Sequence, residues 1–271
     1  MELMKYPRTR HLEGSRLQSG DLGDDKPLAE LAGLPLVVEE KIDGANCAVS
    51  FSDTGEVRLQ SRGHFLTGGY RERHFDLLKT WSSVHVSSLR EVLGSRYIMY
   101  GEWLYAKHTS FYDALPHYFL EFDLFDKEEG HFLSTAQRRQ ILGGLPVMPV
   151  PVLHEGDLPS HRHVDALVTT SLYKSPDWRQ ALMRAAEASG NRPEMVERQT
   201  EDTDLSEGLY IKLEDGRSVI DRFKYVRAGF IQTLTEADSH WHSRPILPNQ
   251  LADGVDVFAP VLGVKGAYDE T

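Results

Sequence analysis

The sequence lacks several features that would place it in a special class of protein. Its single cysteine, Cys47, excludes an intrachain disulfide and fits a reducing compartment. No apolar run approaches the roughly 18 residues that a membrane-spanning helix needs. The N-terminal stretch MELMKYPRTRHLEG also lacks the basic and then apolar order of a signal peptide. These absences predict a soluble, cytoplasmic protein without a membrane partner.

Positive charge is scarce overall, because 41 acidic residues outnumber 30 lysines and arginines and give a formal net charge of -11. Proteins that coat nucleic acid depend on neutralising phosphates, so this total argues against that class. Basic residues nevertheless gather in RGHFLTGGYRERH (62–74) and RSVIDRFKYVR (217–227). A local basic groove and mixed, solvated faces are both compatible with this pattern, and charge alone favours the mixed faces.

What is present is an ordinary globular composition, 40% hydrophobic and 26% charged over 271 residues. Short strand patterns dominate, with helical patterns between them, so we predict an α+β fold with mostly antiparallel sheet. The expected strands cover 36–41, 46–52, 56–62, 97–105, 118–126, 207–215 and 218–226, and the expected helices cover 74–94, 134–144 and 175–190. Ser134 and Ser175 are the expected N-caps of the last two helices, with Pro176 at the first helical position. We expect an irregular leader over 1–35 and a small helical appendage over 227–271.

Lys41 ends the apolar strand LVVEEK and is followed closely by Asp43 and Gly44. Alternation along the strand places Val37, Glu39 and Lys41 on one face. We expect Asp43 and Gly44 to turn the chain, with Gly44 free to adopt a positive φ. A surface lysine beside a hairpin and a nucleophilic lysine both fit this position. The nucleophile requires burial or neighbouring cations that lower the pKa of Lys41.

Other strands could supply those cations. Arg222 and Lys224 share one face of SVIDRFKYV, where they could bind a triphosphate and depress the pKa of Lys41. Phe223 and Tyr225 face the other way, and we expect them in the core. Arg62 adds a further positive charge at the end of another strand. These residues predict an anion-binding surface near Lys41.

Two carboxylates and one aromatic ring complete the set of candidate residues. Glu102 in YGEW and Glu207 in SEGLYIK each lie beside a glycine in a strand. Such a pair could orient the waters of a magnesium ion or hold a ribose hydroxyl. Phe122 in EFDLFD could offer a flat face to a purine, although a phenylalanine in a strand is usually part of the core.

Taken in order, EEKIDGAN, SRG, YGEW, EFDLFD, EGLYIK and RFKYV resemble the motifs of the covalent nucleotidyltransferase superfamily of polynucleotide ligases and mRNA capping enzymes. The chain looks most like the RNA ligase 2-like branch of ATP-dependent RNA ligases, over about residues 37–226. The resemblance implies an ATP-grasp-like nucleotidyltransferase fold that holds the nucleotide between antiparallel sheets. It also implies an adenylyltransferase domain over 1–226. Fewer than 50 residues follow the last motif, so we expect no OB domain.

The resemblance further implies three steps: a lysine attacks ATP to give lysyl-AMP, AMP passes to a 5′-phosphate RNA end, and a 3′-hydroxyl end then seals the strand. ATP and Mg²⁺ or Mn²⁺ are the implied cofactors, RNA ends the implied partners, and an end-healing kinase or phosphatase a possible one. The implied roles are Lys41 as nucleophile, Glu39 or Glu40 by the adenine amino group, Asn46 and Arg62 by sugar and phosphate, Glu102 on ribose and metal, Phe122 on adenine, Glu207 on metal, and Arg222 and Lys224 on phosphates. Arg222 departs from the lysine that is usual in the family.

Other activities fit parts of the same pattern. A DNA ligase or a GTP-using capping enzyme would share the covalent lysine, and a degenerate ligase could bind a nucleotide or RNA without catalysis. His240 and His242 flank Trp241, where a local structural role is favoured over nucleic-acid contact and over a metal site. Lys107 and His108 follow GEWLY and are candidates for either substrate contact or a structural role.

Overall fold

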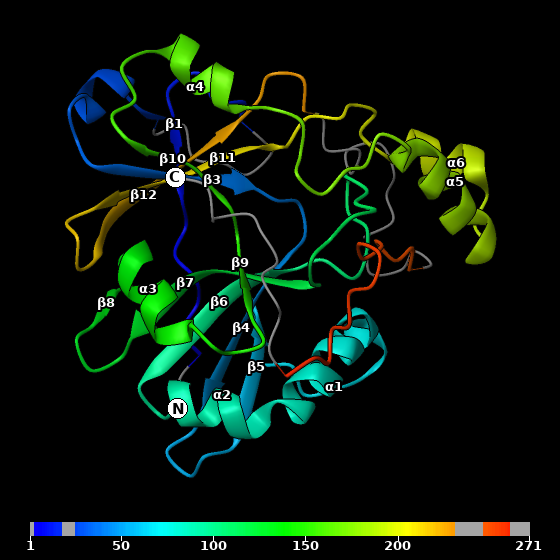
Figure 1. Ribbon diagram of the computed structural model, residues 1–271, viewed down its shortest axis with the longest axis horizontal. Helices are drawn as coiled ribbons and strands as arrows, with labels where there is room; N and C mark the ends of the chain where they lie inside the picture. Colours follow the sequence, from blue (N-terminus) through cyan, green and yellow to red (C-terminus); the bar gives the residue numbers. More distant parts are fainter. Residues whose placement is uncertain (1–2, 18–24, 231–245, 261–271) are drawn as a thin grey trace.

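Two six-stranded sheets form the body of the protein in a computed structural model that describes residues 3–17, 25–230 and 246–260 (Figure 1). The first sheet contains, in order, β10 (Val152–Gly156), β3 (Leu36–Lys41), β11 (Gly208–Glu214), β12 (Val219–Val226), β1 (Arg10–Leu12) and β2 (Asp25–Lys26). The second contains β5 (Val57–Ser61), β4 (Ala45–Phe51), β6 (Tyr97–Trp103), β7 (Phe119–Asp126) and β8 (His131–Phe132), with β9 (Met148–Pro149) beside β7. Most pairings are antiparallel, which confirms the predicted fold class.

The helices of the described residues are α1 (Asp76–Val84), α2 (Val86–Leu93), α3 (Thr135–Leu142), α4 (His161–Leu167), α5 (Trp178–Ala188) and α6 (Pro193–Arg198), with 3-10 turns at Leu28–Leu31 and Tyr70–Phe75. Helices α1 and α2 cover the outer face of the second sheet, and α4 covers that of the first (Figure 1). Trp81 of α1 packs in one core with the buried Cys47. Val164 of α4 packs in another with Phe223 and Tyr225 of β12. These outer cores hold apolar side chains of both sheets, whereas the space between the sheets holds an aromatic cluster as well as buried charged groups such as Glu39 and Lys212.

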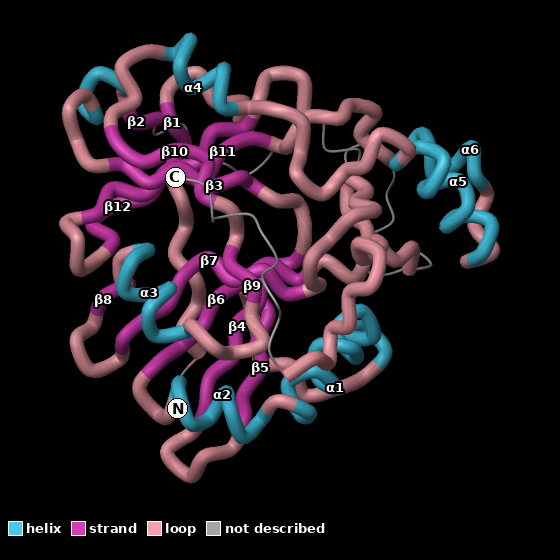
Figure 2. Tube along the Cα trace, in the orientation of Figure 1, coloured by secondary structure: helices cyan, strands magenta, loops and turns pink. Residues whose placement is uncertain are grey.

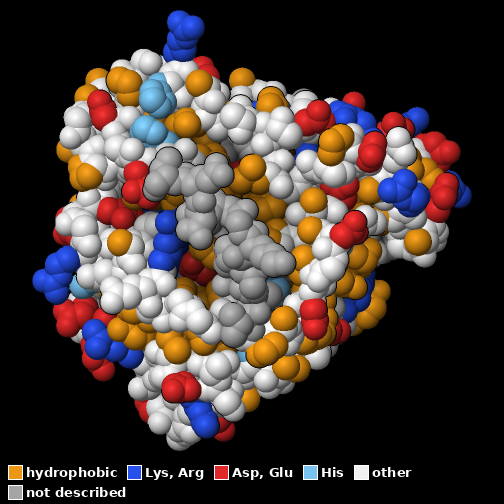
Figure 3. Space-filling model, viewed as in Figure 1, with side chains coloured by type: hydrophobic (Ala, Val, Ile, Leu, Met, Phe, Trp, Pro, Cys, Tyr) orange, Lys and Arg blue, Asp and Glu red, His pale blue; other side chains and the backbone are white. Residues whose placement is uncertain are grey.

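Helices α5 and α6 form a separate lobe beside the two-sheet body (Figure 2). Their small core contains Trp178, Leu182 and Val196, together with Phe111 and Leu247 from elsewhere in the chain. Acidic and basic side chains alternate over this lobe on the face shown in Figure 3.

The chain ends differ from the sequence-based expectation. The leader, which we expected to be irregular, contains β1 and β2. Because β1 pairs with β12 in parallel and β2 pairs with β1, these leader residues are part of the first sheet. Within 227–271, the described residues 227–230 and 246–260 contain no helix, and the remainder of the expected helical appendage lies outside the described residues. No helix in the described part of the chain is long and apolar enough to cross a membrane.

Two predicted helix starts had different outcomes. Ser134 accepts a hydrogen bond from the backbone N–H of Gln137 and caps α3, as the sequence indicated. Helix α5 begins at Trp178 rather than at Pro176, with Asp177 at the N-cap. Ser175 instead bonds to Asp113 and accepts from the N–H of Asp177, so its hydroxyl forms a turn before the helix.

Candidate functional site

Lys41 lies where the chain passes from one sheet to the other. It is the last residue of β3 in the first sheet, and Ala45 begins β4 in the second. The alternative of a surface lysine beside a hairpin is therefore wrong, because the segment that contains Asp43 and Gly44 is a crossover between sheets. Gly44 does not use the positive φ that glycine allows. A Cβ atom there would lie 2.7 Å from Leu104 and 2.8 Å from the carbonyl oxygen of Trp103, so close packing against β6 requires glycine.

Glu207 is the direct partner of Lys41. The pairing of β11 with β3 sets Gly208 opposite Lys41, and the Lys41 Nζ lies 2.7 Å from the Glu207 Oε2. The Glu207 side chain is only 3% exposed, whereas that of Lys41 is 24% exposed. Gly208 cannot carry a side chain, because its Cβ would lie 1.8 Å from the carbonyl oxygen of Tyr225. The strand pairing thus brings a reachable ammonium against a buried carboxylate.

The charges around Lys41 have the opposite sign to the one we expected. Burial lowers the pKa of Lys41, but Glu207, Glu102 and Asp43 outweigh it and raise the pKa above its usual value. The prediction that neighbouring cations depress this pKa is therefore wrong. Lys41 is held here as an ammonium, and its nucleophilic form requires a change in the carboxylates around it.

Glu102 faces the same space from the second sheet. It lies on β6 directly opposite Asn46 of β4, which is half-buried. Burial raises the pKa of Glu102 to about 8, and Asp43 and Glu207 add to the effect although Lys41 opposes it. Burial likewise raises the pKa of Glu207 to about 7. Asn46, Glu102, Glu207 and Lys41 are therefore brought together as the sequence predicted.

These carboxylates suit a hydrated divalent ion rather than a fully enclosed one. Among the described residues, no group of three or more His, Cys, Asp or Glu side chains converges as a ready-made metal site. Mg²⁺ keeps several waters and is commonly held by one or two carboxylates together with substrate phosphates. Glu102 and Glu207 fit that smaller requirement, so they are the residues that would hold the ion.

Asp43 has a structural role that our sequence reasoning missed. Its Oδ2 accepts hydrogen bonds from the backbone N–H groups of Thr109 and Ser110, both at 2.7 Å. Its own N–H donates to the Tyr112 hydroxyl at 2.9 Å. Asp43 thereby ties the crossover to the loop that follows β6. Its place two residues after the candidate nucleophile was the available signal.

The three predicted phosphate-binding cations lie at different depths. Lys224 is opposite Tyr210 on the inner face, and its positive charge acts to lower the pKa of Glu207. Arg62 is exposed just beyond the end of β5, at the same end of the second sheet as Asn46. Arg222 lies farther in, 3.6 Å from Asp123. Only Lys224 is thus placed beside the Lys41 and Glu207 pair by a direct electrostatic contact.

Arg222 is held by aromatic rings as well as by charge. Its guanidinium lies 4.1 Å from the ring centre of Phe132 and 5.4 Å from that of Tyr6. Tyr6 also packs at 5.1 Å against Phe122, the predicted adenine-stacking residue. Phe122 is half-buried and tilts toward Tyr210 at 6.3 Å. Both Arg222 and Phe122 therefore belong to an aromatic cluster between the sheets, which includes the leader residue Tyr6.

Neither glutamate before Lys41 has a free carboxylate. Glu39 lies 2.7 Å from Arg138 and 2.9 Å from Lys212, and all three side chains are fully buried. Glu40 accepts hydrogen bonds from the Ser171 hydroxyl at 2.5 Å and from a backbone N–H. Glu39 points between the sheets on the face of Lys41, as the alternation predicted, and it anchors an ion cluster there.

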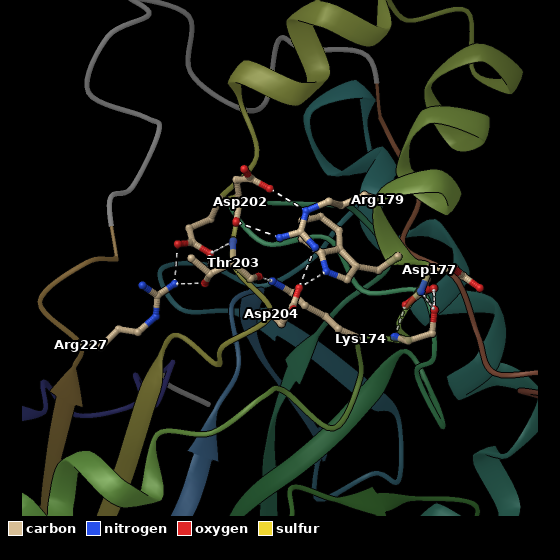
Figure 4. A network of polar contacts seen from close by, with 11 residues as sticks. Lys174, Asp177, Arg179, Asp202, Thr203, Asp204 and Arg227 are labelled. Atoms are coloured by element: carbon tan, nitrogen blue, oxygen red, sulfur yellow. Dashed lines mark hydrogen bonds and ion pairs between the residues drawn. The ribbon is translucent and has the colours of Figure 1, made fainter.

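The segment that leads to Glu207 is fixed from both sides (Figure 4). Arg179 of α5 donates to Asp202 at 2.8 Å, and Arg227, just after β12, donates to the Thr203 hydroxyl at 2.8 Å. The position of Glu207 therefore depends on the α5 lobe as well as on strand β11, which begins at the next residue.

The remaining candidate residues are Lys107, His240 and His242. The Lys107 Nζ donates to the carbonyl oxygens of His108 and Gln199, at 2.9 and 2.8 Å, which gives it a structural role. His240 and His242 lie outside the described residues.

Comparison with known proteins places the chain in a family. A profile of the RNA ligase family matches residues 34–226, well over half of the sequence. The chain therefore belongs to the RNA ligase family, which confirms the resemblance drawn from the motifs. No curated protein sequence matches it.

Several solved structures resemble this one. A Naegleria gruberi RNA ligase mutant with ATP and Mn aligns over 84% of this chain and 61% of its own, with 16% identity and a TM-score of 0.46. Another mutant of that ligase, with AMP and Mn, aligns over 81% and 59%, with 16% identity and a TM-score of 0.45. An archaeal ATP-dependent RNA ligase aligns over 84% and 49%, with 17% identity and a TM-score of 0.49. The chain spans about half to three fifths of the length of these proteins.

Proposed function

We propose that the protein is an ATP-dependent RNA ligase that acts through an AMP group carried on Lys41. The observation that carries the proposal is the Lys41 ammonium, partly exposed and held 2.7 Å from Glu207 at the crossover between the sheets. Membership of the RNA ligase family and the nearby Glu102, Asn46 and Lys224 support this role for Lys41.

The first step is a transfer of AMP. The Lys41 Nζ attacks the α-phosphorus of ATP, a phosphorus–nitrogen bond forms, and the bond to the bridging oxygen breaks as pyrophosphate leaves. Lys41 must lose its proton first. When bound by Glu102 and Glu207, a divalent ion supplies charge neutralisation for the triphosphate and a competing partner for Glu207. Loss of the Glu207 contact lowers the pKa of Lys41, and its proton passes to the solvent that reaches Nζ.

Other residues bind and orient the nucleotide. Asn46 and Glu102 lie opposite each other and would contact the ribose, while Lys224 and Arg62 would contact phosphates. Phosphoryl transfer depends mainly on such alignment and on positive charge around the phosphates. Phe122 would have to expose its ring beyond Tyr6 to stack on adenine.

The later steps join RNA ends. AMP passes from Lys41 to a 5′-phosphate, which forms a pyrophosphate link, and the 3′-hydroxyl of the other end displaces AMP to form the phosphodiester. Ends with other chemistry require a kinase or phosphatase to prepare them. A DNA nick or GTP would use the same bond changes, so the assay must compare these substrates directly.

The test is covalent labelling with α-labelled ATP and Mg²⁺ or Mn²⁺, followed by denaturation. Wild type should retain the label and Lys41→Ala should not. Lys79→Ala is the matched control, because Lys79 lies on α1 and pairs with Glu72 at 3.1 Å. Competition by GTP and parallel sealing of RNA and DNA nicks then define the substrate. Unlabelled wild type, shown to be free of bound AMP, would instead favour a nucleotide- or RNA-binding module.

A further inference from the structure

The loop after β6 is clamped by a segment from near the C-terminus. Asn249 is fully buried, and its side chain forms two hydrogen bonds to the loop backbone. The Oδ1 accepts from the N–H of Tyr112 at 3.0 Å, and the Nδ2 donates to the carbonyl oxygen of Leu104 at 2.7 Å. A backbone N–H can only donate and a carbonyl can only accept, so these partners require an amide in this orientation.

Backbone pairing strengthens the same clamp. The Asn249 N–H donates to the carbonyl oxygen of Tyr105 at 2.9 Å, and the Gln250 N–H donates to that of Tyr112 at 2.8 Å. Asn249 thus holds the loop at its start and at its end. The family match stops at residue 226, so this contact comes from outside the matched region.

Both ends of the clamped loop touch the segment that carries Lys41. The Tyr112 hydroxyl accepts from the N–H of Asp43, and the Asp43 carboxylate accepts from Thr109 within the loop. The Leu104 side chain packs where any Cβ on Gly44 would lie. A short series of contacts therefore runs from Asn249 through the loop to the crossover that sets the position of the Lys41 ammonium.

We propose that Asn249 is a positioning residue for the attack of Lys41 on ATP. The proposal rests on the proposed function. By fixing Leu104 and Tyr112, Asn249 holds the crossover so that Nζ lies in line with the α-phosphate. Misplacement of a reacting group by about 1 Å can cost on the order of a hundredfold in rate. The role is specific to the step in which Lys41 is the nucleophile.

The test separates that step from the last one. Single-turnover labelling of Lys41 at saturating ATP measures the first step, and sealing of a chemically pre-adenylated RNA strand measures the last step without Lys41 as nucleophile. We expect Asn249→Leu, which removes both hydrogen bonds at similar volume, to slow labelling by about ten- to a hundredfold. Sealing of the pre-adenylated strand should remain within about threefold of wild type, a difference of under 1 kcal/mol.

Two other variants keep the test informative. Gln250→Ala is the matched control, because Gln250 contributes to the clamp through its backbone N–H, which the substitution retains. It should behave as wild type in both steps. Tyr112→Phe removes only the hydroxyl that accepts from the N–H of Asp43. It therefore removes one contact between the loop and the crossover and leaves Asn249 unchanged. It should reproduce the selective loss of labelling, and it remains usable where Asn249→Leu does not fold.

Each outcome decides the question. Slow labelling with intact sealing of the pre-adenylated strand supports the positioning role. An equal loss in both steps shows a general structural role and overturns it, as does labelling at the wild-type rate in Asn249→Leu and Tyr112→Phe. A wild-type protein that takes no label overturns the proposed function itself, and the role of Asn249 with it.

Discussion

Replacing Glu102 by glutamine should stabilise the protein, and more so as the pH rises. Burial raises the pKa of Glu102 from 4.5 to about 8. Below pH 4.5, the carboxyl is protonated in both the folded and the unfolded chain, so it contributes no pH-dependent term. Between pH 4.5 and about pH 8, the unfolded chain releases the proton while the folded chain keeps it, so the free energy of unfolding falls as the pH rises. Above about pH 8 the loss is complete.

The size of the effect follows from the same two values. Each pH unit between them corresponds to about 1.36 kcal/mol, which sets a ceiling of about 5 kcal/mol for the full loss. Glutamine does not ionise, and its amide oxygen can still accept from the N–H of Gly44, which bonds to Glu102 in the wild type. The advantage of Glu102→Gln in unfolding free energy should therefore grow by a few kcal/mol between pH 5 and pH 8.

Urea unfolding at several pH values measures this difference directly. Glu91→Gln on α2 is the control, because Glu91 is exposed and lies away from the crossover. Its effect should be the same at pH 5 and pH 8. A Glu102→Gln advantage that stays flat or shrinks as the pH rises would show that Glu102 is ionised in the folded protein. The burial of this carboxylate beside Asp43 and Glu207 would then be refuted.

Two substitutions test the packing around the site. Lys212→Met should cost about 3–5 kcal/mol in urea unfolding, because it leaves the buried Glu39 carboxylate short of a partner, whereas Lys26→Met in an exposed pair should cost at most about 1 kcal/mol. Comparable costs for the two would contradict the burial of the ion cluster. Gly44→Ala should lower the unfolding free energy by about 1–3 kcal/mol and reduce labelling by ATP, since no space exists for its Cβ. Gly63→Ala, with nothing within 4 Å, should do neither, and equal effects would contradict the close approach at Gly44.

The sequence allowed the sheet faces to be predicted, because alternation is a local property of strands. Phe223 and Tyr225 point into the outer core, and Glu39 and Lys41 share the inner face, as expected. Helix α3 also begins where its capping serine indicated. These features depend only on residues a few positions apart.

Features that depend on distant segments could not be predicted in this way. Asp43 followed by glycine is a common turn signal, but here the chain crosses to another sheet, and only the position of β6 explains Gly44. Two of the carboxylates that raise the pKa of Lys41, Glu102 on β6 and Glu207 just before β11, are more than 60 residues away in the sequence. Asn249 belongs to none of the sequence motifs, and its role can be seen only from the loop that it contacts.

The most direct test of the account is to locate AMP on the protein. Wild type incubated with ATP and Mg²⁺ is digested without acid, which preserves a phosphorus–nitrogen bond, and its peptides are analysed by mass spectrometry. We expect one AMP group, on Lys41, and none in Lys41→Ala. AMP on Lys212 or Lys224 instead, or no modified peptide from protein free of bound AMP, would contradict the assignment of Lys41 as the nucleophile.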